Sequence, residues 1–329
     1  MKLHVLTKAD VQQAITMREA IEVVKDAFAQ LSGGRAKVPL RTALEVPEQE
    51  GVVLFMPAYL ASSGGLGAKV VSVFPRNSQR GLPTIHAVVL LVDSATGQPQ
   101  AMLDGTYLTA LRTGAASGAA TDLLARPEAR TAAIFGAGAQ GRTQLAAVCA
   151  VRQIERAWVY DVDVEAAERY VQELRGQPGM PPHLAVAASP ADAVREADII
   201  CTATTSHTPV FDSSDVRPGT HINAIGAFTP EMQEVDVAGL GAARIVVDSR
   251  EACLAEAGDL IIPLRQGLIP EAEAWTELGE IVVGRAPGRA SSQEITYFKS
   301  VGNAVQDVSV GQAILAAAQR LGLGREVEL

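Results

Sequence analysis

A short apolar run that breaks into glycines and continues as a helix constrains this fold more than any other feature. The stretch TAAIFGAGAQGRTQLAA begins at Thr131 and places Gly136, Gly138 and Gly141 in the pattern G-x-G-x-x-G. In such a turn the first glycine permits a tight bend, the second lets the backbone approach a phosphate, and the third lets the helix pack closely on the strand. The helix N-terminus offers unpaired N–H groups and partial positive charge to an anion. The stretch therefore predicts a dinucleotide-binding site.

The residues after this turn alternate between short apolar strands and helices. Helices are expected to begin at Gln140, Val164 and Pro190, and the further strands are RAWVYD, LAVAAS, DIICTAT, THINAIG and RIVVDS. Apolar strands that alternate with helices form a parallel sheet covered on both faces. We therefore predict an α/β fold with a Rossmann-type doubly wound parallel sheet.

A second domain is expected before the glycine turn, because 329 residues are many for a single core. A capping box from Thr16 to Glu19 opens a helix that Gly33 ends. Short β-rich runs follow, and the Ala- and Gly-rich helix LTALRTGAASGAATDLLA then leads to the turn. We expect an α+β domain over residues 1–125, joined by a C-terminal helix over 304–329, and a dinucleotide-binding domain over 126–303.

Composition and charge exclude several classes of partner. The formal net charge of −9 argues against nucleic acids and anionic membrane surfaces. No apolar run approaches the roughly 20 residues that span a bilayer, and the N-terminus does not resemble a secretory signal. Cys149, Cys201 and Cys253 are odd in number and lack CxxC spacing, which favours a reducing compartment. We expect a cytoplasmic protein without nucleic-acid or membrane partners.

Histidine and cysteine spacing predicts no metal site. The sequence has no HExxH pattern, no paired Cys/His spacing and no GxSxG elbow of a serine hydrolase. His86 and His221 fall within predicted strands, where we expect buried histidines bonded inside the core. His207 falls in the loop TSHTP.

Asp161 ends the strand that follows the glycine turn and bears on which dinucleotide binds. A carboxylate there accepts hydrogen bonds from ribose hydroxyls and repels a 2′-phosphate. No arginine follows at once, and the run YDVDVE adds a second acid at Asp163. We expect NAD(H) to be preferred, with NADP(H) as the alternative; a solvated acid at a strand end is the non-functional interpretation.

Three cations upstream lie in apolar or small-residue surroundings. They are Arg41 in VPLRTAL, Lys69 in LGAKVVS and Arg112 in TALRTGAAS. A buried cation is costly unless it is paired, and arginine can hold a carboxylate with two hydrogen bonds. A buried lysine has a lowered pKa and can donate a proton. The three therefore predict a site for an anionic substrate, unless Asp93 or Asp104 pairs with them in a purely structural role.

Several motifs, in order along the chain, resemble the ornithine cyclodeaminase/mu-crystallin family. They are MPAY, GLPTIHAVVLLVDSATGQPQAMLDGTYLTALRTGAAS, GAGAQG, INAIGAFTPEMQEV, VVDS and FKSVGNAVQD, and the match runs from about Val38 to Asp307. The family includes ornithine and lysine cyclodeaminases, an archaeal-type alanine dehydrogenase, cyclic ketimine reductases and mu-crystallins. The resemblance implies a homodimer, with a substrate-binding and dimerisation domain beside an NAD-binding Rossmann domain.

The same resemblance implies a set of site residues. Lys69 and Arg112 would be catalytic, and the substrate, a small amino or imino acid, would contact Arg41, Lys69, Arg112 and Val301. The implied cofactor contacts are Thr84, Arg112, Gly136, Gly138, Ala139, Gln140, Gly141, Asp161, Thr202, Asn223, Ile225 and Ser300.

Two departures from the cyclodeaminase pattern favour a reductase. The acidic residue expected soon after the INAIG strand is replaced by Phe228, and the acid near MPAY by Leu54 and Phe55. A phenylalanine can neither accept a proton nor pair with an ammonium group. We expect an NAD(P)H-dependent reductase of cyclic imino acids, of the pyrroline-2-carboxylate or ketimine type, or a related amino-acid dehydrogenase. An NAD-dependent ornithine cyclodeaminase and a mu-crystallin-like binding protein are the alternatives.

Overall fold

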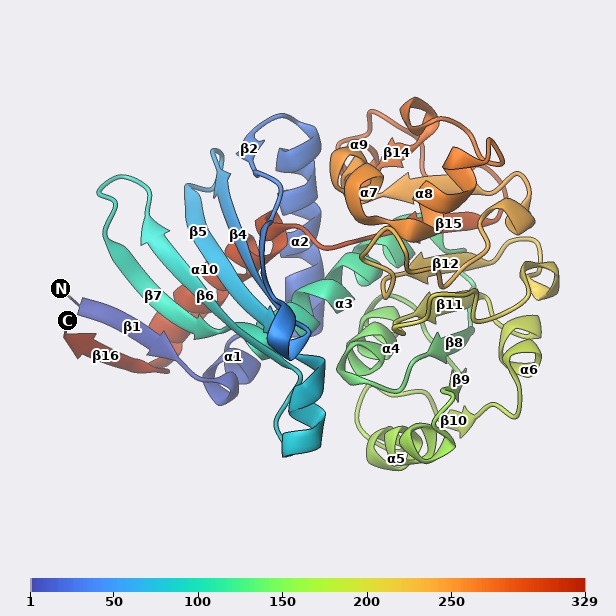
Figure 1. Cartoon of the computed structure of the whole chain (residues 1–329), viewed down its shortest axis with the longest axis horizontal. Coiled ribbons are helices and arrows are strands. Elements are labelled where there is room, and N and C mark those ends of the chain that lie inside the picture. Colours follow the sequence, from blue (N-terminus) through green and yellow to red (C-terminus); the bar gives the residue numbers. More distant parts are fainter. Residues whose placement is uncertain (1, 329) are drawn as a thin grey trace. The chain divides into compact units, whose positions relative to one another are not determined.

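The computed structural model describes residues 2–328, which divide into two compact units (Figure 1). One unit comprises residues up to Arg112 together with those from Asn303 onward, and the other runs from Thr113 to Gly302. We expected the first domain to extend to residue 125, whereas the division falls inside α3 (Gly105–Leu124). The reason is local: the Arg152 guanidinium of the second unit donates to the carbonyl groups of Thr121 and Asp122 near the end of α3.

The first unit is a mixed sheet with helices. Its strand order is β16-β1-β7-β6-β5-β4-β2, and β3 pairs with β4. The strands are β1 (Lys2–Leu6), β2 (Ala36–Lys37), β3 (Thr42–Val46), β4 (Gly51–Leu60), β5 (Gly65–Val73), β6 (Ile85–Asp93), β7 (Pro99–Asp104) and β16 (Arg325–Glu328). The helices are α1 (Lys8–Ala14), α2 (Met17–Ser32) and α10 (Ala304–Leu321), with 3-10 turns η1 (Pro47–Gln49) and η2 (Pro75–Arg80).

Helix α10 covers one face of this sheet and leaves the other face open. It contacts β4, β5 and β6, and α2 packs on it (Figure 1). Along β6 the side chains alternate, so that Val89 and Leu91 are buried while Val88 and Leu90 are exposed. The predicted capping box of α2 is confirmed, because the Thr16 hydroxyl accepts from the Glu19 N–H and the Glu19 carboxylate accepts from the Thr16 N–H.

The second unit confirms the predicted doubly wound parallel sheet. Its strand order is β10-β9-β8-β11-β12-β15-β13-β14. The strands are β8 (Thr131–Phe135), β9 (Arg156–Tyr160), β10 (His183–Val186), β11 (Ile199–Thr202), β12 (His221–Ala224), β13 (Arg244–Val247), β14 (Thr276–Glu277) and β15 (Thr296–Lys299). The helices are α4 (Ala139–Val151), α5 (Val164–Leu174), α6 (Pro190–Arg195), α7 (Arg250–Glu256), α8 (Gly258–Arg265) and α9 (Leu278–Val282), with 3-10 turns η3 (Ser213–Asp215), η4 (Ala238–Leu240) and η5 (Ala272–Ala274).

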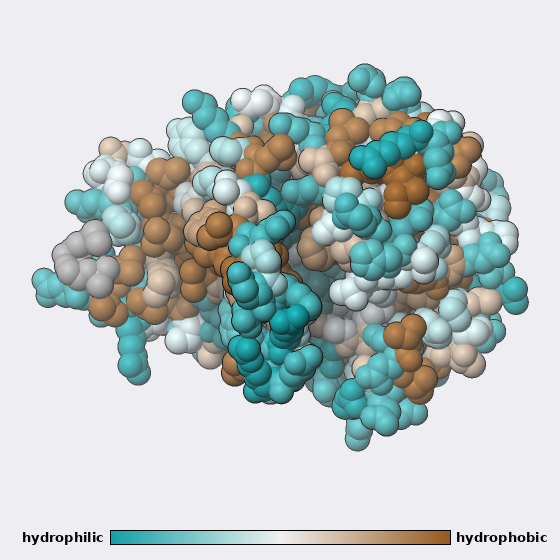
Figure 2. Space-filling view, viewed as in Figure 1, coloured by the Kyte–Doolittle hydropathy of each residue, from teal (hydrophilic) through white to brown (hydrophobic). Residues whose placement is uncertain are grey.

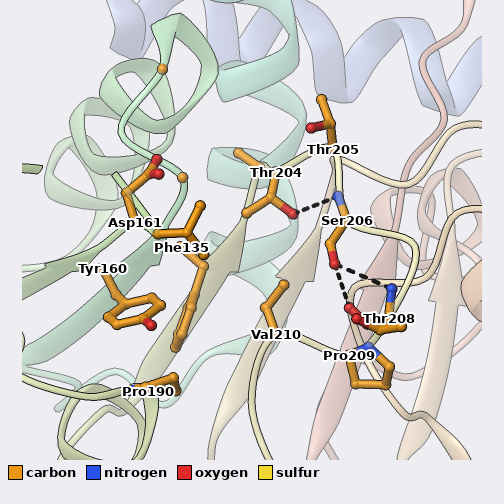
Figure 3. Close-up of a pocket in the computed structure, with 14 residues that line it drawn as sticks. Phe135, Tyr160, Asp161, Pro190, Thr204, Thr205, Ser206, Thr208, Pro209 and Val210 are labelled. Atoms are coloured by element: carbon orange, nitrogen blue, oxygen red, sulfur yellow. Dashed lines mark hydrogen bonds between the residues drawn. The ribbon is translucent and has the colours of Figure 1, made fainter. Parts of the chain in front are cut away.

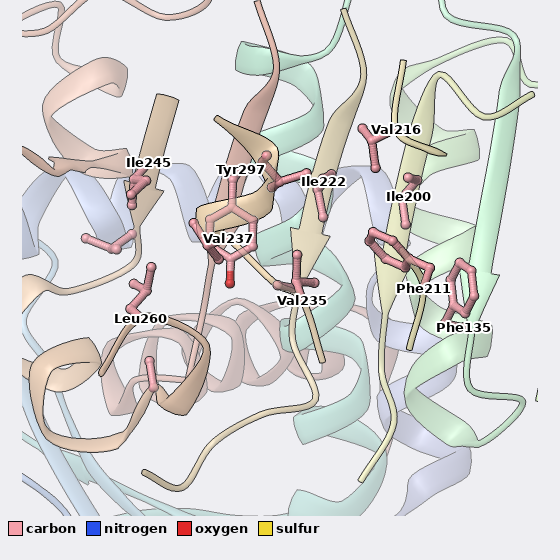
Figure 4. Close-up of a cluster of buried hydrophobic side chains, with 14 of the residues drawn as sticks. Phe135, Ile200, Phe211, Val216, Ile222, Val235, Val237, Ile245, Leu260 and Tyr297 are labelled. Atoms are coloured by element: carbon pink, nitrogen blue, oxygen red, sulfur yellow. The ribbon is translucent and has the colours of Figure 1, made fainter. Parts of the chain in front are cut away.

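Successive residues of β8 belong to different cores, which explains its unbroken apolar sequence. Ala132 and Ile134 pack into one cluster, with residues of α4 and α5. Ala133 and Phe135 pack into the other, which also holds Tyr297 (Figure 4). Both faces of the sheet are therefore covered, as expected for parallel strands.

Strand β15 was not expected. It is absent from the strands that we expect for this domain, yet it lies between β12 and β13 and pairs in parallel with both. It is short and carries Thr296 and Lys299 at fully buried positions, so its sequence shows no continuous apolar run.

None of the helices within residues 2–328 combines the length and apolar character needed to cross a membrane. Cys149, Cys201 and Cys253 are unpaired. Burial raises the pKa of the Cys149 and Cys201 thiols to about 12.

Candidate functional site

The glycine turn has the backbone geometry that its pattern predicts. Gly136 has a φ of +100°, and a Cβ there would lie 2.6 Å from the Ala203 carbonyl oxygen. A Cβ at Gly141 would collide with the carbonyl oxygen of Gly136, so only glycine permits this approach of helix to strand. A Cβ at Gly138 would meet nothing within 4 Å. The backbone at Gly138 therefore faces open space.

Helix α4 begins directly after this turn without a side-chain cap. Its N-cap residue is Gly138, and no side chain accepts from the first N–H groups there. Ala139 is exposed and Gln140 is half-buried in the first turn. The uncapped N–H groups and the helix dipole together form a site for an anion such as a phosphate.

A cavity of about 540 Å³ opens beside the turn (Figure 3). It lies where β8 and β11 end, which is the position at which the chain reverses the direction in which it builds the sheet. Its lining residues are Phe135, Gly136, Gly138, Tyr160, Asp161, Val162, Pro190, Ala203, Thr204, Thr205, Ser206, Thr208, Pro209 and Val210. An apolar cleft with a phosphate-binding turn at its edge fits a dinucleotide.

Asp161 lines this cavity and is held in place by the turn. Its Oδ2 accepts from the Ala137 N–H at 2.7 Å, and its Oδ1 accepts from the Asp163 N–H at 3.0 Å. The carboxylate therefore stands beside the glycine turn with lone pairs remaining for ligand hydroxyl groups.

Three further residues implied as cofactor contacts are buried, and their side chains bond within the same unit. The Thr202 hydroxyl donates to Glu234, and the Ser300 hydroxyl donates to Asp248. The Asn223 amide donates to the Thr121 hydroxyl at 3.0 Å. These bonds are internal to the unit, and the one from Asn223 ties β12 to α3, so its side chain lies in the core.

The remaining implied residues are dispersed. The Ile225 N–H donates to the Thr202 carbonyl just past the end of β12. Val301 is buried, and its N–H donates to Asp248. Thr84 belongs to the first unit, where it is exposed and its carbonyl accepts from the Phe74 N–H.

Two of the three predicted cations form a buried cluster in the first unit. Lys69 lies on β5 and Arg112 on α3, and both contact Asp307 of α10. The Lys69 Nζ is 2.8 Å from Asp307 Oδ2, and the Arg112 Nε donates to Asp307 Oδ1 at 3.0 Å. Arg41 is half-buried and contributes to the positive potential at Lys69. One carboxylate thus faces two cations, and one positive charge is left over while Lys69 is protonated.

Burial sets the ionisation of Lys69. Loss of hydration and the nearby Arg112 together lower its pKa to about 7, although Asp307 acts in the opposite direction. A lysine in this state exchanges a proton near neutral pH. Asp307 was missed at the sequence level; the signal was an acid within FKSVGNAVQD, a motif quoted only for the family resemblance.

Asp93 and Asp104, the acids of the purely structural alternative, bond within their own turns. The Asp93 carboxylate accepts from the N–H groups of Ala95 and Thr96 in its own turn. Asp104 accepts from the Tyr107 N–H at the start of α3. The acid that pairs with Lys69 and Arg112 is instead Asp307.

Gln306, next to Asp307, orients Arg112. Its Oε1 accepts from Arg112 at 2.6 Å and from the Asn303 N–H at 3.0 Å. This residue too was missed; the available signal was the capping-box spacing of Asn303 and Gln306 at the start of α10.

The histidine expectations were met in part. His221 is fully buried, with Nδ1 2.9 Å from the Thr296 hydroxyl and Nε2 3.2 Å from Asn223 Oδ1, which confirms a core histidine. Burial lowers its pKa to about 3. His86 is exposed on β6, so its assignment to the core was wrong: its side chain falls on the open face of the sheet. His207 is an exposed loop residue, as expected.

Phe228 stands where the cyclodeaminase pattern has an acidic residue, and two acids, Glu231 and Glu234, follow it in the sequence. Phe228 is 36% exposed, and Glu231 is an exposed surface residue. Glu234 is fully buried and accepts five hydrogen bonds.

Among the residues the structure describes, no group of three His, Cys, Asp or Glu side chains could hold a metal ion.

A Rossmann-type unit with a phosphate-binding glycine turn, in a chain that also carries a buried lysine–arginine cluster, defines a dinucleotide-dependent oxidoreductase. The model of the ornithine cyclodeaminase/mu-crystallin family matches residues 1–320, and the chain belongs to this family.

Its relatives include enzymes that match over their full length. A Delta(1)-pyrroline-2-carboxylate reductase of Bacillus cereus is 41% identical over 98% of this chain and 99% of that protein. The structure of Thermococcus litoralis Delta(1)-pyrroline-2-carboxylate reductase in complex with NADH and L-proline has a TM-score of 0.94 and 43% identity, covering 99% of this chain and 100% of that one. An archaeal alanine dehydrogenase dimer with bound NAD has a TM-score of 0.91 and 36% identity, with full coverage of both chains.

Proposed function

We propose that this chain is an NADH-dependent reductase of cyclic α-imino acids, with pyrroline-2-carboxylate as the foremost substrate. The observation that carries this proposal is the buried cluster in which Lys69 and Arg112 share the single carboxylate of Asp307. Two full-length relatives at 41% and 43% identity carry this activity in their names, and one of them was solved with NADH and L-proline, the product of such a reduction.

The cation cluster suits a substrate that carries one carboxylate. Asp307 neutralises one positive charge, so Arg112 and a protonated Lys69 together retain one for the substrate carboxylate. Arginine can hold such a group with two parallel hydrogen bonds, whereas a free amine would be repelled. A cyclic imino acid offers one carboxylate next to an electrophilic carbon.

The residues around the glycine turn would hold NADH, which when bound would supply a hydride to the C=N carbon of the imine and leave as NAD⁺. Lys69, with its pKa lowered to about 7, would provide the proton that the imine nitrogen must gain. Lys69 and Arg112 would thus orient the substrate and stabilise charge, without a covalent intermediate.

The second unit supports NAD(H) as the cofactor. The Asp161 carboxylate lies in the cavity beside the glycine turn, where it would accept from ribose hydroxyls and repel a 2′-phosphate. We therefore infer a preference for NAD(H), with weaker use of NADP(H).

The open face of the first sheet suggests a homodimer. Leu44, Phe55, Val88, Leu90 and Met102 are exposed, and the strand register places Leu90 opposite Met102. The space-filling view shows apolar residues gathered over this part of the molecule (Figure 2). A face of this kind is usually covered by a partner, and a solved relative is a dimer. We propose that a second copy of the chain covers it.

The three cysteines form no disulfide bonds, which fits a cytoplasmic location.

The experiment that tests the proposal is a substrate panel followed at the NADH absorbance. Pyrroline-2-carboxylate should be reduced faster than pyruvate with ammonia, and ornithine should release no ammonia. Ornithine turnover with catalytic NAD would support the cyclodeaminase alternative, whereas binding without turnover of any substrate would support a mu-crystallin-like binding role.

A further inference from the structure

Glu234 connects the ends of two neighbouring strands of the dinucleotide-binding sheet. Its Oε1 accepts from the N–H and hydroxyl of Thr204 at 2.6 and 2.7 Å, just past β11. Its Oε2 accepts from the N–H groups of Gly226 and Ala227, just past β12, at 2.6 and 3.0 Å, and from the Thr202 hydroxyl at 3.0 Å. A single buried carboxylate therefore fixes both turns.

The bonds from Glu234 continue into the rim of the cavity. The Thr204 hydroxyl accepts from the Ser206 N–H at 3.2 Å, and the Ser206 hydroxyl bonds the N–H and carbonyl of Thr208 (Figure 3). Thr204, Ser206 and Thr208 all line the cavity. The position of this rim thus depends on one acidic side chain that is not itself among the lining residues.

The surroundings of Glu234 make its position specific. A Cβ at Gly226 would lie 2.5 and 2.6 Å from the two carboxylate oxygens of Glu234, so glycine at this position leaves the space that the carboxylate occupies. The Glu234 N–H donates to Asp259 Oδ1 at 2.7 Å. Asp259 in turn pairs with the buried Lys299 at 2.8 Å. Backbone and side chain of Glu234 are therefore held independently.

We propose that Glu234 is a positioning residue for the cofactor: it holds the 204–208 rim and the 226–227 turn in the conformation that binds NADH. The proposal rests on the proposed function in that the dinucleotide is taken to be NADH. Glu234 acts through Thr204 and Gly226, and it need not touch the ligand.

The variant Glu234→Gln tests this proposal with almost no change in volume. Three of the five donors to Glu234 are backbone N–H groups, which cannot reverse their role. In either orientation the glutamine NH₂ faces at least one of them. We expect the Kd of NADH, measured by its fluorescence, to rise about tenfold, as for buried donors that lose their acceptor. The KM for the imino acid at saturating NADH should stay within about threefold, because the cation cluster is untouched.

Asp198→Asn is the matched control. Asp198 also accepts from two backbone N–H groups, those of Arg130 and Thr131, but at the amino ends of β8 and β11 rather than the carboxyl ends. It should lower the Tm much as Glu234→Gln does and leave the Kd of NADH within about twofold of wild type. Equal increases in the Kd of NADH for both variants would overturn the proposal, since a general loss of stability of the second unit would then explain both increases.

A milder variant keeps the proposal testable if Glu234→Gln does not fold. Thr204→Val removes the hydroxyl that links Glu234 to Ser206 and keeps the backbone bond. We expect a rise of about threefold in the Kd of NADH, the effect of one buried hydrogen bond; a wild-type value would overturn the proposal.

The proposed function and the proposed role of Glu234 can fail independently of each other. If the wild-type chain binds NADH but reduces no imino acid, the proposed function fails while the role of Glu234 is still decided by these Kd values.

Discussion

Lys69 and Asp307 form an ion pair that is almost completely removed from solvent, with side-chain exposures of 1% and 0% and an Nζ–Oδ2 distance of 2.8 Å. Removing one partner of such a pair leaves an uncompensated charge in a poorly hydrated place. The carboxylate here is shared with Arg112, so it does not fully offset the cost of burying the lysine. This is why the pKa of Lys69 falls to about 7 although an acid touches it.

Asp307→Asn should move the alkaline limb of the pH–rate profile to lower pH. Asp307 raises the pKa of Lys69, so its loss lowers that pKa below the wild-type value of about 7. The protonated donor is present below this pKa and declines as the pH rises through it, so kcat/KM should begin to fall at a lower pH in the variant. Profiles of both proteins on the same imine, at saturating NADH, remove the titration of the substrate from the comparison. An unshifted limb would mean that Lys69 is not the donor.

Arg112→Lys keeps the charge and should still impair the enzyme. The guanidinium now bonds Asp307 and Gln306 through different nitrogens, and a compact ammonium cannot reproduce this fork. We expect kcat/KM for pyrroline-2-carboxylate to fall about 10²-fold, with most of the change in KM. Steady-state kinetics at saturating NADH would measure this. Near wild-type values would show that charge alone, and not the planar fork, binds the substrate.

Asp161→Asn should relax the preference for NADH over NADPH. The amide oxygen can still accept from the Ala137 N–H, so the glycine turn keeps its support while the negative charge is lost. The ratio of the Kd of NADPH to that of NADH should fall by about tenfold, equivalent to about 1.4 kcal/mol. Asp161→Ala, which loses this support as well, should also weaken NADH. Clear preference of the wild-type chain for NADPH would refute our interpretation of Asp161.

Leu90→Asp should separate the dimer into monomers. Leu90 is exposed on the open face of the first sheet, directly opposite Met102, and an aspartate there would be buried in the interface. Light scattering should give a mass near twice 34.5 kDa for the wild type and near 34.5 kDa for the variant. Leu268→Asp, at an exposed leucine of the second unit, is the control and should stay dimeric. A monomeric wild type at working concentrations would exclude this assembly.

The glycine turn could be predicted because local backbone geometry alone requires glycine at these positions. A φ of +100° at Gly136 and the collision that a Cβ at Gly141 would cause are local requirements, and they show in the sequence as glycines at fixed spacing. The alternation of strands and helices is local too, and it gave the correct fold class.

Features that depend on distant contacts could not be predicted in the same way. Asp307 and Lys69 are 238 positions apart in the chain, so the residues around each of them do not indicate that the two form an ion pair. Strand β15 ends in Lys299, which a buried strand tolerates only because Asp259, 40 positions earlier, pairs with it. His86 was placed in the core because its strand is apolar, but only the pairing register decides which face of β6 meets α10.

The central claim is that this chain reduces cyclic imino acids with NADH. The most direct measurement is the oxidation of NADH by the purified chain with pyrroline-2-carboxylate, run beside an ammonia assay with ornithine and catalytic NAD. The account predicts stoichiometric loss of NADH and formation of proline from the imine, with no ammonia from ornithine. Proline and ammonia formed in equal amounts from ornithine, with no net use of NADH, would contradict it.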